Sequence, residues 1–405
     1  MNNAMLDFDE AQRRLSEAGS APASAETCPL PAAFGRILAQ DIVARVDLPP
    51  ADNSAMDGYA IRYADYAPGK AFPVQQRCFA GESPQALKPG QTIRLFTGCV
   101  MPEGADTVVM QEDTLEQDNT LTITTAPAQG AHVRLRGEDV EQDQVVLSAG
   151  TVVRAPEMAM LASQGIHEVQ VWPRLRVGIL TTGDELVAPG KPLGPAQIYN
   201  SNGAMLSGLV QQMGADVVHT LHAADTHEAI EAAFQTLLED CDLVLTVGGV
   251  SVGEKDLVKP TLELLGGKLD LWKVCMKPGK PVALATARNK PVVCLPGNPV
   301  SAFVVFALLV SPLVRRLQGR ANVLPPVGYG RLRTHSQFHE TREEFLRVQC
   351  KPNAKGMPVL VPYALQGSAI ISALPWASGL ARIPVNTVVG DDDIVAYYDF
   401  AHWLS

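Results

Sequence analysis

Apolar and polar positions follow different periods in different parts of the chain. From residue 174 to about residue 319, short β-branched runs are followed by stretches with helical periodicity, a pattern that predicts parallel strands joined by crossover helices. Residues 72–123 and the stretch beyond residue 328 show short apolar runs separated by glycine, proline and aspartate, which is typical of small all-β modules. We therefore expect one α/β domain and at least two β modules.

Three shorter segments also have regular patterns. Residues 6–18 predict a helix, with Asp7 as its N-cap and Glu10 three positions later. Residues 149–173 indicate a strand, a short helix and a second strand. The longest apolar run, Ala302–Val314, is interrupted by a serine and a proline and is too short to span a bilayer, so we expect a buried helix there.

The stretch from Cys241 to Asp256 carries the clearest sign of a ligand site. Its first half is an apolar run, which predicts a strand buried on both faces, and the run then breaks at Gly248-Gly249 and again at Gly253. Glycines allow backbone N–H groups to approach an anion closely, and such strand ends are typical of ligand loops in open α/β sheets. A glycine-rich connection without a ligand explains a single loop of this kind equally well.

Two more predicted strands end in the same manner. The strand over 177–180 precedes GDE (183–185), and the strand over 292–295 precedes PGNP (296–299). In PGNP, Asn298 is placed to cap a helix and the second proline to occupy its first turn, so free N–H groups should face the loop. The three loops together favour a site at the carboxyl edge of one sheet. Their spacing matches neither the dinucleotide fingerprint nor the lysine-bearing phosphate loop.

Length, charge and cysteine content narrow the class of protein. The 405 residues allow two to four domains, and a hydrophobic content of 46% is ample for packed cores. The net charge of −10 argues against a nucleic-acid or anionic-membrane surface, so we expect neither partner. Seven cysteines without a C-x-x-C pair, and an N-terminus without an export signal, predict reduced thiols in a cytoplasmic protein. His335 and His339 lack nearby metal-type partners and give little support for a zinc site.

Eight motifs along the chain resemble those of one family. In order, they are DNSAMDGYA (52–60), FTGCVMPEGADTVVMQED (96–113), RLRGEDV (134–140), ILTTGDEL (179–186), TVGGVSVGEKD (246–256), KPGKP (277–281), LPGNPVSA (295–302) and LQGSAIISAL (365–374). The chain is similar over almost its full length to the molybdopterin molybdenumtransferases, the MoeA and gephyrin E-domain family. The resemblance implies an α/β and β multidomain fold with a central three-layer, MogA-like molybdopterin-binding domain (174–322), a split α+β domain (1–46 plus 140–173), an inserted β domain (47–139) and a C-terminal β barrel (323–405).

By this resemblance, the chain inserts molybdenum from molybdate into the dithiolene of adenylated molybdopterin, releases AMP and depends on Mg²⁺. The resemblance also implies a homodimer in which the β module of one subunit faces the α/β domain of the other, and transient contacts with other molybdenum cofactor biosynthesis proteins. The implied catalytic residues are Asp57, Thr97, Asp139, Asp225, Lys273, Lys277 and Ser368. The expected substrate-binding residues are Thr182, Gly183, Asp184, Gly248, Gly249, Ser251, Gly253, Lys280, Pro296, Gly297, Asn298, Pro299 and Ser301.

The residue types fit this chemistry, although each has a simpler interpretation. We assign Lys273 and Lys277 to phosphate or molybdate oxygens, because an anionic pterin that meets an oxyanion needs cationic donors; a solvated lysine cluster is the alternative. Glu185 and Asp256 follow glycine breaks at strand ends, and their oxygens suit Mg²⁺. Asp225 is also explained as a helix cap, because a glutamate follows it three positions later.

Other positions carry weaker signals. Asp57 and Thr97 each stand beside a glycine and are also explained as turn residues. Glu254 stands where the family usually has aspartate, which keeps the charge on a longer side chain. No serine, histidine and aspartate grouping is evident, so we expect no covalent enzyme intermediate.

Two other functions fit the same sequence. The α/β domain alone resembles the molybdopterin adenylyltransferases, so the chain could instead adenylate the pterin with ATP. The additional β modules argue against that reaction. A gephyrin-like binding scaffold would need an exposed apolar groove, and the intact site residues favour the enzyme over it.

Overall fold

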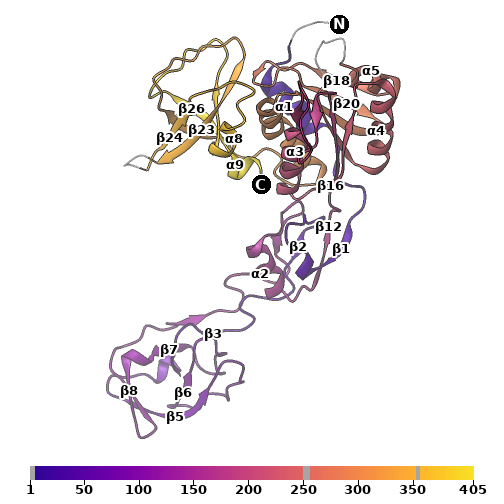
Figure 1. Cartoon of the computed structure of the whole chain (residues 1–405). Helices are drawn as coiled ribbons and strands as arrows, with labels where there is room; N and C mark the ends of the chain where they lie inside the picture. Colours follow the sequence, from indigo (N-terminus) through magenta and orange to yellow (C-terminus); the bar gives the residue numbers. More distant parts are fainter. Residues whose placement is uncertain (1–4, 250–255, 353–355) are drawn as a thin grey trace. The chain divides into compact units, whose positions relative to one another are not determined.

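The computed structural model describes residues 5–249, 256–352 and 356–405 of the chain. The chain divides into two compact units (Figure 1): unit 1 comprises Met1–Gln40, Ala149–Arg154 and Glu168–Ser405, and unit 2 comprises Asp41–Ser148 and Ala155–His167. Unit 1 contains the predicted α/β and C-terminal β regions, and unit 2 contains most of the predicted inserted β module. This division is coarser than the four predicted domains, whose boundaries stay a prediction.

A six-stranded sheet forms the centre of unit 1, with the strand order β16-β13-β17-β21-β20-β18. The first four strands are parallel to one another. Because β20 is antiparallel to both of its neighbours, β18 points in the same direction as those four. Five strands therefore end at one edge of the sheet, including the three predicted to do so. Their bounds are Arg176–Thr182 (β13), Asp216–Ala223 (β16), Leu243–Val247 (β17), Lys268–Trp272 (β18) and Lys290–Leu295 (β21), and β20 spans Ala283–Ala287.

Side chains of this sheet alternate between two hydrophobic clusters. In β17, for example, Leu245 points into one cluster and its neighbour Val244 into the other. The first cluster includes side chains of α3 (Ser201–Gln212) and of the helix that follows β21, and the second includes those of α4 (His227–Asp240) and α5 (Val258–Leu264). Helices thus cover both faces, which confirms the predicted three-layer α/β domain.

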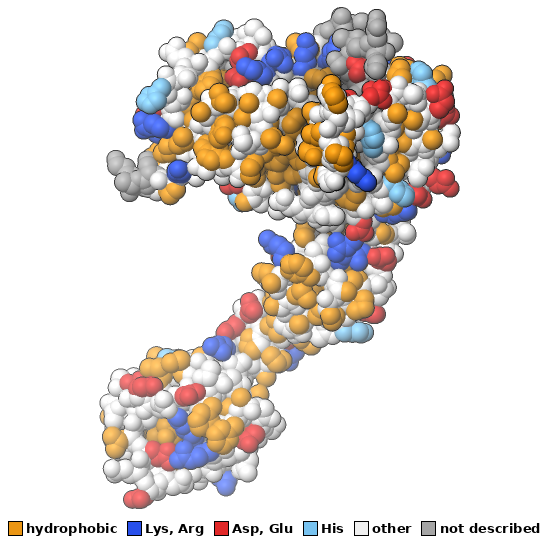
Figure 2. All heavy atoms as spheres, in the orientation of Figure 1, with side chains coloured by type: hydrophobic (Ala, Val, Ile, Leu, Met, Phe, Trp, Pro, Cys, Tyr) orange, Lys and Arg blue, Asp and Glu red, His pale blue; other side chains and the backbone are white. Residues whose placement is uncertain are grey.

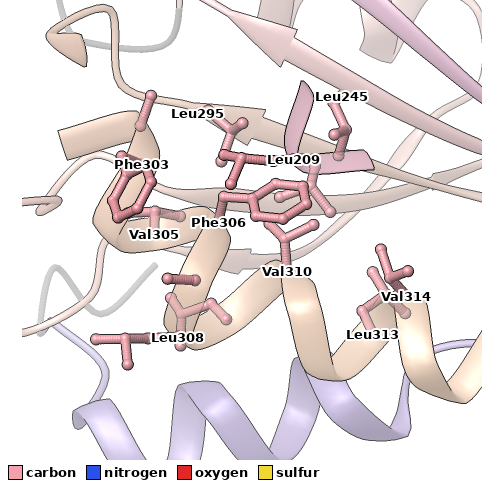
Figure 3. Packing of buried hydrophobic residues seen from close by; sticks show 14 of the residues in the cluster. Leu209, Leu245, Leu295, Phe303, Val305, Phe306, Leu308, Val310, Leu313 and Val314 are labelled. Atoms are coloured by element: carbon pink, nitrogen blue, oxygen red, sulfur yellow. The ribbon is translucent and has the colours of Figure 1, made fainter. Parts of the chain in front are cut away.

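The apolar run 302–314 is a buried helix, as predicted. Residues Pro299–Leu317 form a continuous helix in three parts, namely α6 (Pro299–Val305), a π-helical segment (Phe306–Val310) and α7 (Ser311–Leu317). Figure 3 shows its apolar side chains packed beside Leu245 and Leu295 of the sheet. Within the described ranges, this is the one helix long and apolar enough to cross a membrane, and 94% of that apolar window is buried inside the protein. It is a core helix.

The N-terminal helix α1 (Phe8–Glu17) packs against this core helix. It begins at the predicted cap Asp7, whose Oδ1 accepts the N–H of Asp9 at 2.9 Å. In α-helical geometry the Leu308 carbonyl would accept from residue 312, which is a proline and has no N–H. Gln12 of α1 donates its Nε2 to that carbonyl at 2.8 Å instead. The helix thus packs with the α/β sheet, whereas the predicted split domain groups it with residues 140–173.

The C-terminal part of unit 1 is a closed β barrel, which confirms the predicted fold class. Strands pair in the order β23-β24-β22-β26-β25, and β25 pairs again with β23. A two-residue strand, β19 (Met276–Lys277), joins this barrel through a parallel pairing with β23. The barrel bounds are Gly328–Leu332 (β22), Glu343–Pro352 (β23), Pro358–Pro362 (β24), Gly379–Ile383 (β25) and Ile394–Asp399 (β26).

Unit 2 is built on a second six-stranded sheet, with the order β7-β4-β6-β5-β9-β8. Its side chains form two small hydrophobic clusters, as expected for an all-β module. Glycine is required at Gly58, the first residue of β4, because a Cβ there would lie 2.2 Å from the Val109 carbonyl oxygen. The bounds are Gly58–Ile61 (β4), Ala71–Cys78 (β5), Thr92–Leu95 (β6), Thr107–Met110 (β7), Thr114–Gln117 (β8) and Thr120–Ile123 (β9), and helix α2 spans Ala155–Ser163.

Candidate functional site

Five loops follow the strands that end at the carboxyl edge of the unit 1 sheet, and we call this row the sheet-edge site. In sheet order they are Ala224–Asp225 after β16, Gly183–Glu185 after β13, Gly248–Gly249 after β17, Pro296–Asn298 after β21 and Lys273–Lys280 after β18. Carboxylates therefore lie at one end, glycine and proline turns in the middle, and lysines at the other end. Four strand spacings separate β13 from β18, which at about 4.8 Å each gives about 19 Å.

At the acidic end, the loops after β13 and β16 bind each other. The N–H of Asp184 donates to Oδ2 of Asp225 at 3.4 Å, and the N–H of Asp225 donates to Oδ1 of Asp184 at 3.2 Å. The prediction that Asp225 caps helix α4 is wrong, because Thr226 is the N-cap and its hydroxyl accepts the N–H of Ala229 at 3.2 Å. The side chain of Asp225 is directed to the neighbouring loop instead.

Glu185 completes the acidic end. Its carboxylate lies over Gly183, since a Cβ at that glycine would sit 2.6 Å from Oε2 of Glu185. The side chain is exposed and makes no hydrogen bond within the part of the chain that the structure describes.

Asp256, the second predicted metal ligand, is half-buried just before α5. The sequence-predicted residues Ser251 and Gly253, and the family departure at Glu254, lie outside the described residues.

In the middle of the edge, Gly248 and Gly249 pack closely against Thr182. Both glycines have positive φ, at 94° and 64°, and a Cβ at Gly248 would lie 2.7 Å from the Thr182 carbonyl oxygen. The buried hydroxyl of Thr182 has no hydrogen-bond partner among the described residues. Buried polar atoms usually pair with a protein group, with water or with a bound group, and glycines without side chains allow a ligand to approach this turn closely.

The PGNP turn after β21 is held from two sides. Pro299 occupies the first turn of α6 as predicted, but Asn298 does not cap that helix with its side chain. Its Nδ2 donates to Oγ of Ser368 at 3.2 Å, and the N–H of Val300 donates to the Ser368 carbonyl oxygen at 3.2 Å. Ser368 of the barrel region is thus brought to the sheet-edge site. Ser301 is buried behind the turn.

Asn202 is a further residue of this turn that the sequence did not single out. Its Nδ2 donates to the Gly297 carbonyl oxygen at 2.6 Å, and its buried Oδ1 has no partner within the described ranges. The sequence signal was present in the run YNSN (199–202), where polar residues mark the start of α3. That signal alone indicates an ordinary helix start.

At the basic end, the three predicted lysines have different environments. Lys273 is half-buried with φ of 62°, and its backbone carbonyl accepts the N–H of Leu6. Lys280 is exposed. The Nζ of Lys277 lies 2.5 Å from Oε1 of Glu340 and 3.0 Å from Oε1 of Glu344. Burial opposes the charged ammonium, but the hydrogen bonds to both glutamates outweigh it and raise the pKa of Lys277.

In unit 2, the structure brings two predicted site residues together. Oδ1 of Asp57 accepts both the N–H and the hydroxyl of Thr97, each at 2.8 Å. These two hydrogen bonds hold the pKa of Asp57 below its ordinary value. Asp139 lies in the same unit with an exposed side chain, and its N–H donates to the Leu48 carbonyl oxygen.

The described residues contain no group of three or more histidine, cysteine, aspartate or glutamate side chains that could hold a metal ion. Two carboxylates, from Asp184 and Asp225, nevertheless lie together at the acidic end. Mg²⁺ usually takes one or two carboxylates together with substrate phosphates, so this donor set fits a magnesium site that a phosphate-bearing ligand completes.

The face of the molecule drawn in Figure 2 carries mixed charge. On the face shown in Figure 2, acidic and basic side chains are interspersed in both units. Two hollows lie elsewhere in unit 1: one of about 400 Å³ beside Arg14, Asp270 and Pro291, and one of about 460 Å³ beside Tyr329 and Ile394. Pro291 stands at the amino end of β21, so the first hollow is at the opposite end of the strands from the sheet-edge site.

Three family models match the chain in succession. The MoeA N-terminal region (domains I and II) matches residues 6–165, a probable molybdopterin binding domain matches residues 178–316, and the MoeA C-terminal region (domain IV) matches residues 329–400. Together these matches cover the sheet-edge site, the barrel and unit 2.

Whole-chain relatives agree with these matches. The chain is 38% identical over 372 residues to the molybdopterin molybdenumtransferase of Haemophilus influenzae. The aligned region covers 91% of this chain and 92% of that protein. It is 35% identical over 373 residues to molybdopterin molybdenumtransferase 2 of Mycobacterium tuberculosis, over 89% of this chain and 91% of that protein. The crystal structure of the molybdopterin biosynthesis moeA protein of Pyrococcus horikoshii superposes with a TM-score of 0.84 at 28% identity, covering 97% of this chain and 99% of that one.

Proposed function

The chain belongs to the molybdopterin molybdenumtransferase family of molybdenum cofactor biosynthesis, and we propose that it transfers molybdenum from molybdate onto the dithiolene of adenylated molybdopterin, with release of AMP. The observation that supports the proposal is the graded sheet edge, with carboxylates at one end and lysines at the other. An elongated substrate with a phosphoanhydride and a dithiolene needs different partners at its two ends.

The grading suggests how the substrate lies. The separation of about 19 Å between β13 and β18 allows an extended pterin nucleotide to lie along the edge. We place the phosphoanhydride near Asp184 and Asp225, one strand away from the glycine turn that follows β17. We place the oxyanion near Lys277 and Ser368, because cationic and hydroxyl donors suit the molybdate oxygens. In this arrangement the middle of the substrate lies over the glycine turn, which packs against Thr182.

Magnesium is assigned to the acidic end. Asp184 and Asp225 would hold it together with the substrate phosphates, and Glu185 and Asp256 remain predicted ligands from the sequence. When bound there, the ion neutralises the anhydride and so favours departure of AMP. The protein residues on either side of it orient the two reacting ends of the substrate.

We also propose a homodimer whose active sites are shared. The Asp57–Thr97 pair belongs to unit 2, and the sheet-edge site belongs to unit 1. In a two-fold dimer, the pair from one subunit can complete the sheet edge of its partner. Mixing Asp57→Ala and Asp256→Ala proteins tests this: a heterodimer has one cleft with both lesions and one with neither, so activity should return. Confirmed heterodimers as inactive as the two parents would contradict sharing.

The cellular setting follows from the same proposal. All seven cysteines are free, five of them buried, which agrees with a cytoplasmic protein. A molybdenum-bearing pterin is a reactive product, so direct transfer to other cofactor-biosynthesis proteins is the expected next contact.

The experiment that tests the function uses purified full-length chain and adenylated molybdopterin. Addition of molybdate should release AMP in proportion to the molybdenum bound to the pterin. Formation of adenylated pterin from ATP, with no AMP release on adding molybdate, would instead support the adenylyltransferase alternative.

A further inference from the structure

The KPGKP segment is attached directly to the barrel, where two glutamates meet its first lysine. Met276 and Lys277 of β19 pair in parallel with Glu343 and Glu344 of β23. The N–H of Glu343 donates to the Cys275 carbonyl oxygen at 3.1 Å, which extends the attachment by one residue. The backbone therefore fixes Lys277 beside Glu344, independently of any side-chain contact.

The two glutamates that contact Lys277 differ in burial. The side chain of Glu344 is 6% exposed, whereas that of Glu340 is 32% exposed and comes from the irregular segment before β23. The neighbouring Glu343 is already paired, because Arg382 donates its Nε to Oε2 of Glu343 at 2.7 Å. Glu340 and Glu344 thus share the ammonium of Lys277, and these three side chains together carry one negative charge. The guanidinium of Arg347 is a further cation close enough to interact with the charge of Glu344.

This charge balance has a consequence for an oxyanion substrate. Molybdate carries two negative charges, and a lysine that is already compensated by two carboxylates attracts it little. One carboxylate has to withdraw before Lys277 can bind the oxyanion. Separating Glu344 from Lys277 would leave a buried carboxylate without this partner, which is costly, whereas the partly exposed Glu340 can turn toward water at smaller cost.

We propose that Glu340 is an internal competitor for the oxyanion: its carboxylate occupies Lys277 until molybdate displaces it, while Glu344 keeps the lysine in position throughout. The inference rests on the proposed function, because it takes Lys277 to be an oxyanion ligand. Glu344 is a positioning residue and Glu340 sets the affinity of the site. To enter the site, an anion has to bind Lys277 more strongly than the Glu340 carboxylate does. This competition favours a dianion over abundant monoanions.

Molybdate binding to the purified full-length protein, measured by isothermal titration calorimetry, tests the proposal. Glu340→Gln should bind molybdate about fivefold more tightly than the wild type, the effect expected when one partly exposed charge pair no longer competes. The control is Asp392→Asn, which removes a more exposed carboxylate of the barrel region, 60% exposed against 32% for Glu340, that pairs with Arg331. It should bind as the wild type does.

The double variant Lys277→Gln/Glu344→Gln removes the lysine without leaving a buried carboxylate unpaired. It should bind molybdate more weakly than the wild type, and adding Glu340→Gln to it should give no further gain. Unchanged affinity in Glu340→Gln, or an equal gain in Asp392→Asn, would overturn the proposal that Glu340 competes with molybdate. The proposed function would remain intact. Unchanged affinity in the double variant, with a native circular dichroism spectrum, would show that Lys277 is not an oxyanion ligand and would count against the proposed site itself.

Discussion

Asp184 and Asp225 each accept the other's backbone N–H, at 3.2 and 3.4 Å, although they are 41 residues apart in the chain. They end two neighbouring parallel strands, β13 and β16. The reciprocal bonds fix both loops and bring two carboxylates together at one end of the sheet edge. Two like charges are close there, which favours a bound cation between or beside them.

Asp225→Asn removes the negative charge of this side chain but keeps its ability to accept a hydrogen bond. The amide oxygen still accepts the N–H of Asp184, so we expect the melting temperature to stay unchanged, while activity falls by about tenfold or more because the proposed magnesium site loses one charge. The control is Thr226→Ala, which removes the observed helix cap and should cost about 1 kcal/mol of stability without abolishing activity. Wild-type activity in Asp225→Asn would show that the residue only accepts a hydrogen bond.

Gly248→Ala should damage the middle of the site. The residue has φ of 94°, and the new Cβ would lie 2.7 Å from the Thr182 carbonyl oxygen, so the loop has to move. We expect a loss of about 2 kcal/mol in the free energy of unfolding together with weaker substrate binding. Gly208→Ala is the matched control, because nothing lies within 4 Å of its added Cβ in helix α3. That variant should be as stable as the wild type or up to about 1 kcal/mol more stable.

Gln12→Ala tests the contact between α1 and the core helix. It removes the donor to the Leu308 carbonyl and leaves that buried oxygen without the Gln12 side chain. We expect a decrease of about 1–2 kcal/mol in the free energy of unfolding, measured by urea titration. Glu17→Ala removes one exposed ion pair with Arg13 on the same helix and should cost less than about 0.5 kcal/mol. Equal midpoints for the two variants would mean that Gln12 adds nothing to the packing of α1.

Thr97→Val should change the titration of Asp57. The Thr97 hydroxyl and N–H both donate to the carboxylate and lower its pKa in the folded protein, so their contribution to stability is present above the ordinary aspartate pKa and is lost as the pH falls through the folded value. Removing the hydroxyl should raise the pKa of Asp57 only part of the way toward the ordinary aspartate value, because the hydrogen bond from the Thr97 N–H remains. Carbon-13 NMR of the Asp57 carboxyl measures this shift, and Thr97→Ser should titrate as the wild type does. No shift in the valine variant would mean that the N–H bond alone lowers the pKa.

Periodicity predicted the elements that carry the site. The apolar run at 177–180 predicted a strand that the structure extends to Arg176–Thr182, and glycine or proline after three strands located most of the sheet edge. The N-cap at Asp7 was also predicted. These features depend on side chains close in sequence, whose spacing and backbone preferences act locally.

Contacts between distant segments could not be predicted in this way. Asp225 and Thr226 are both good capping residues, and only the position of the β13 loop decides that Asp225 turns toward Asp184. Glu340 lies 63 residues beyond Lys277, and Ser368 lies 70 residues beyond Asn298, so their pairing depends on how the barrel docks on the sheet. No local pattern marks a glutamate as the partner of a particular lysine.

The location of molybdenum in crystals of the full-length protein is the most direct test of the proposed oxyanion site. Crystals grown with molybdate can be measured near the molybdenum absorption edge, where anomalous scattering reveals the metal independently of any assumption about the site. We predict one strong peak per chain at the sheet-edge site, between Lys277 at its basic end and the Asn298–Ser368 pair. A peak confined to the hollow beside Arg14 and Asp270, at the opposite end of the strands, would contradict this prediction.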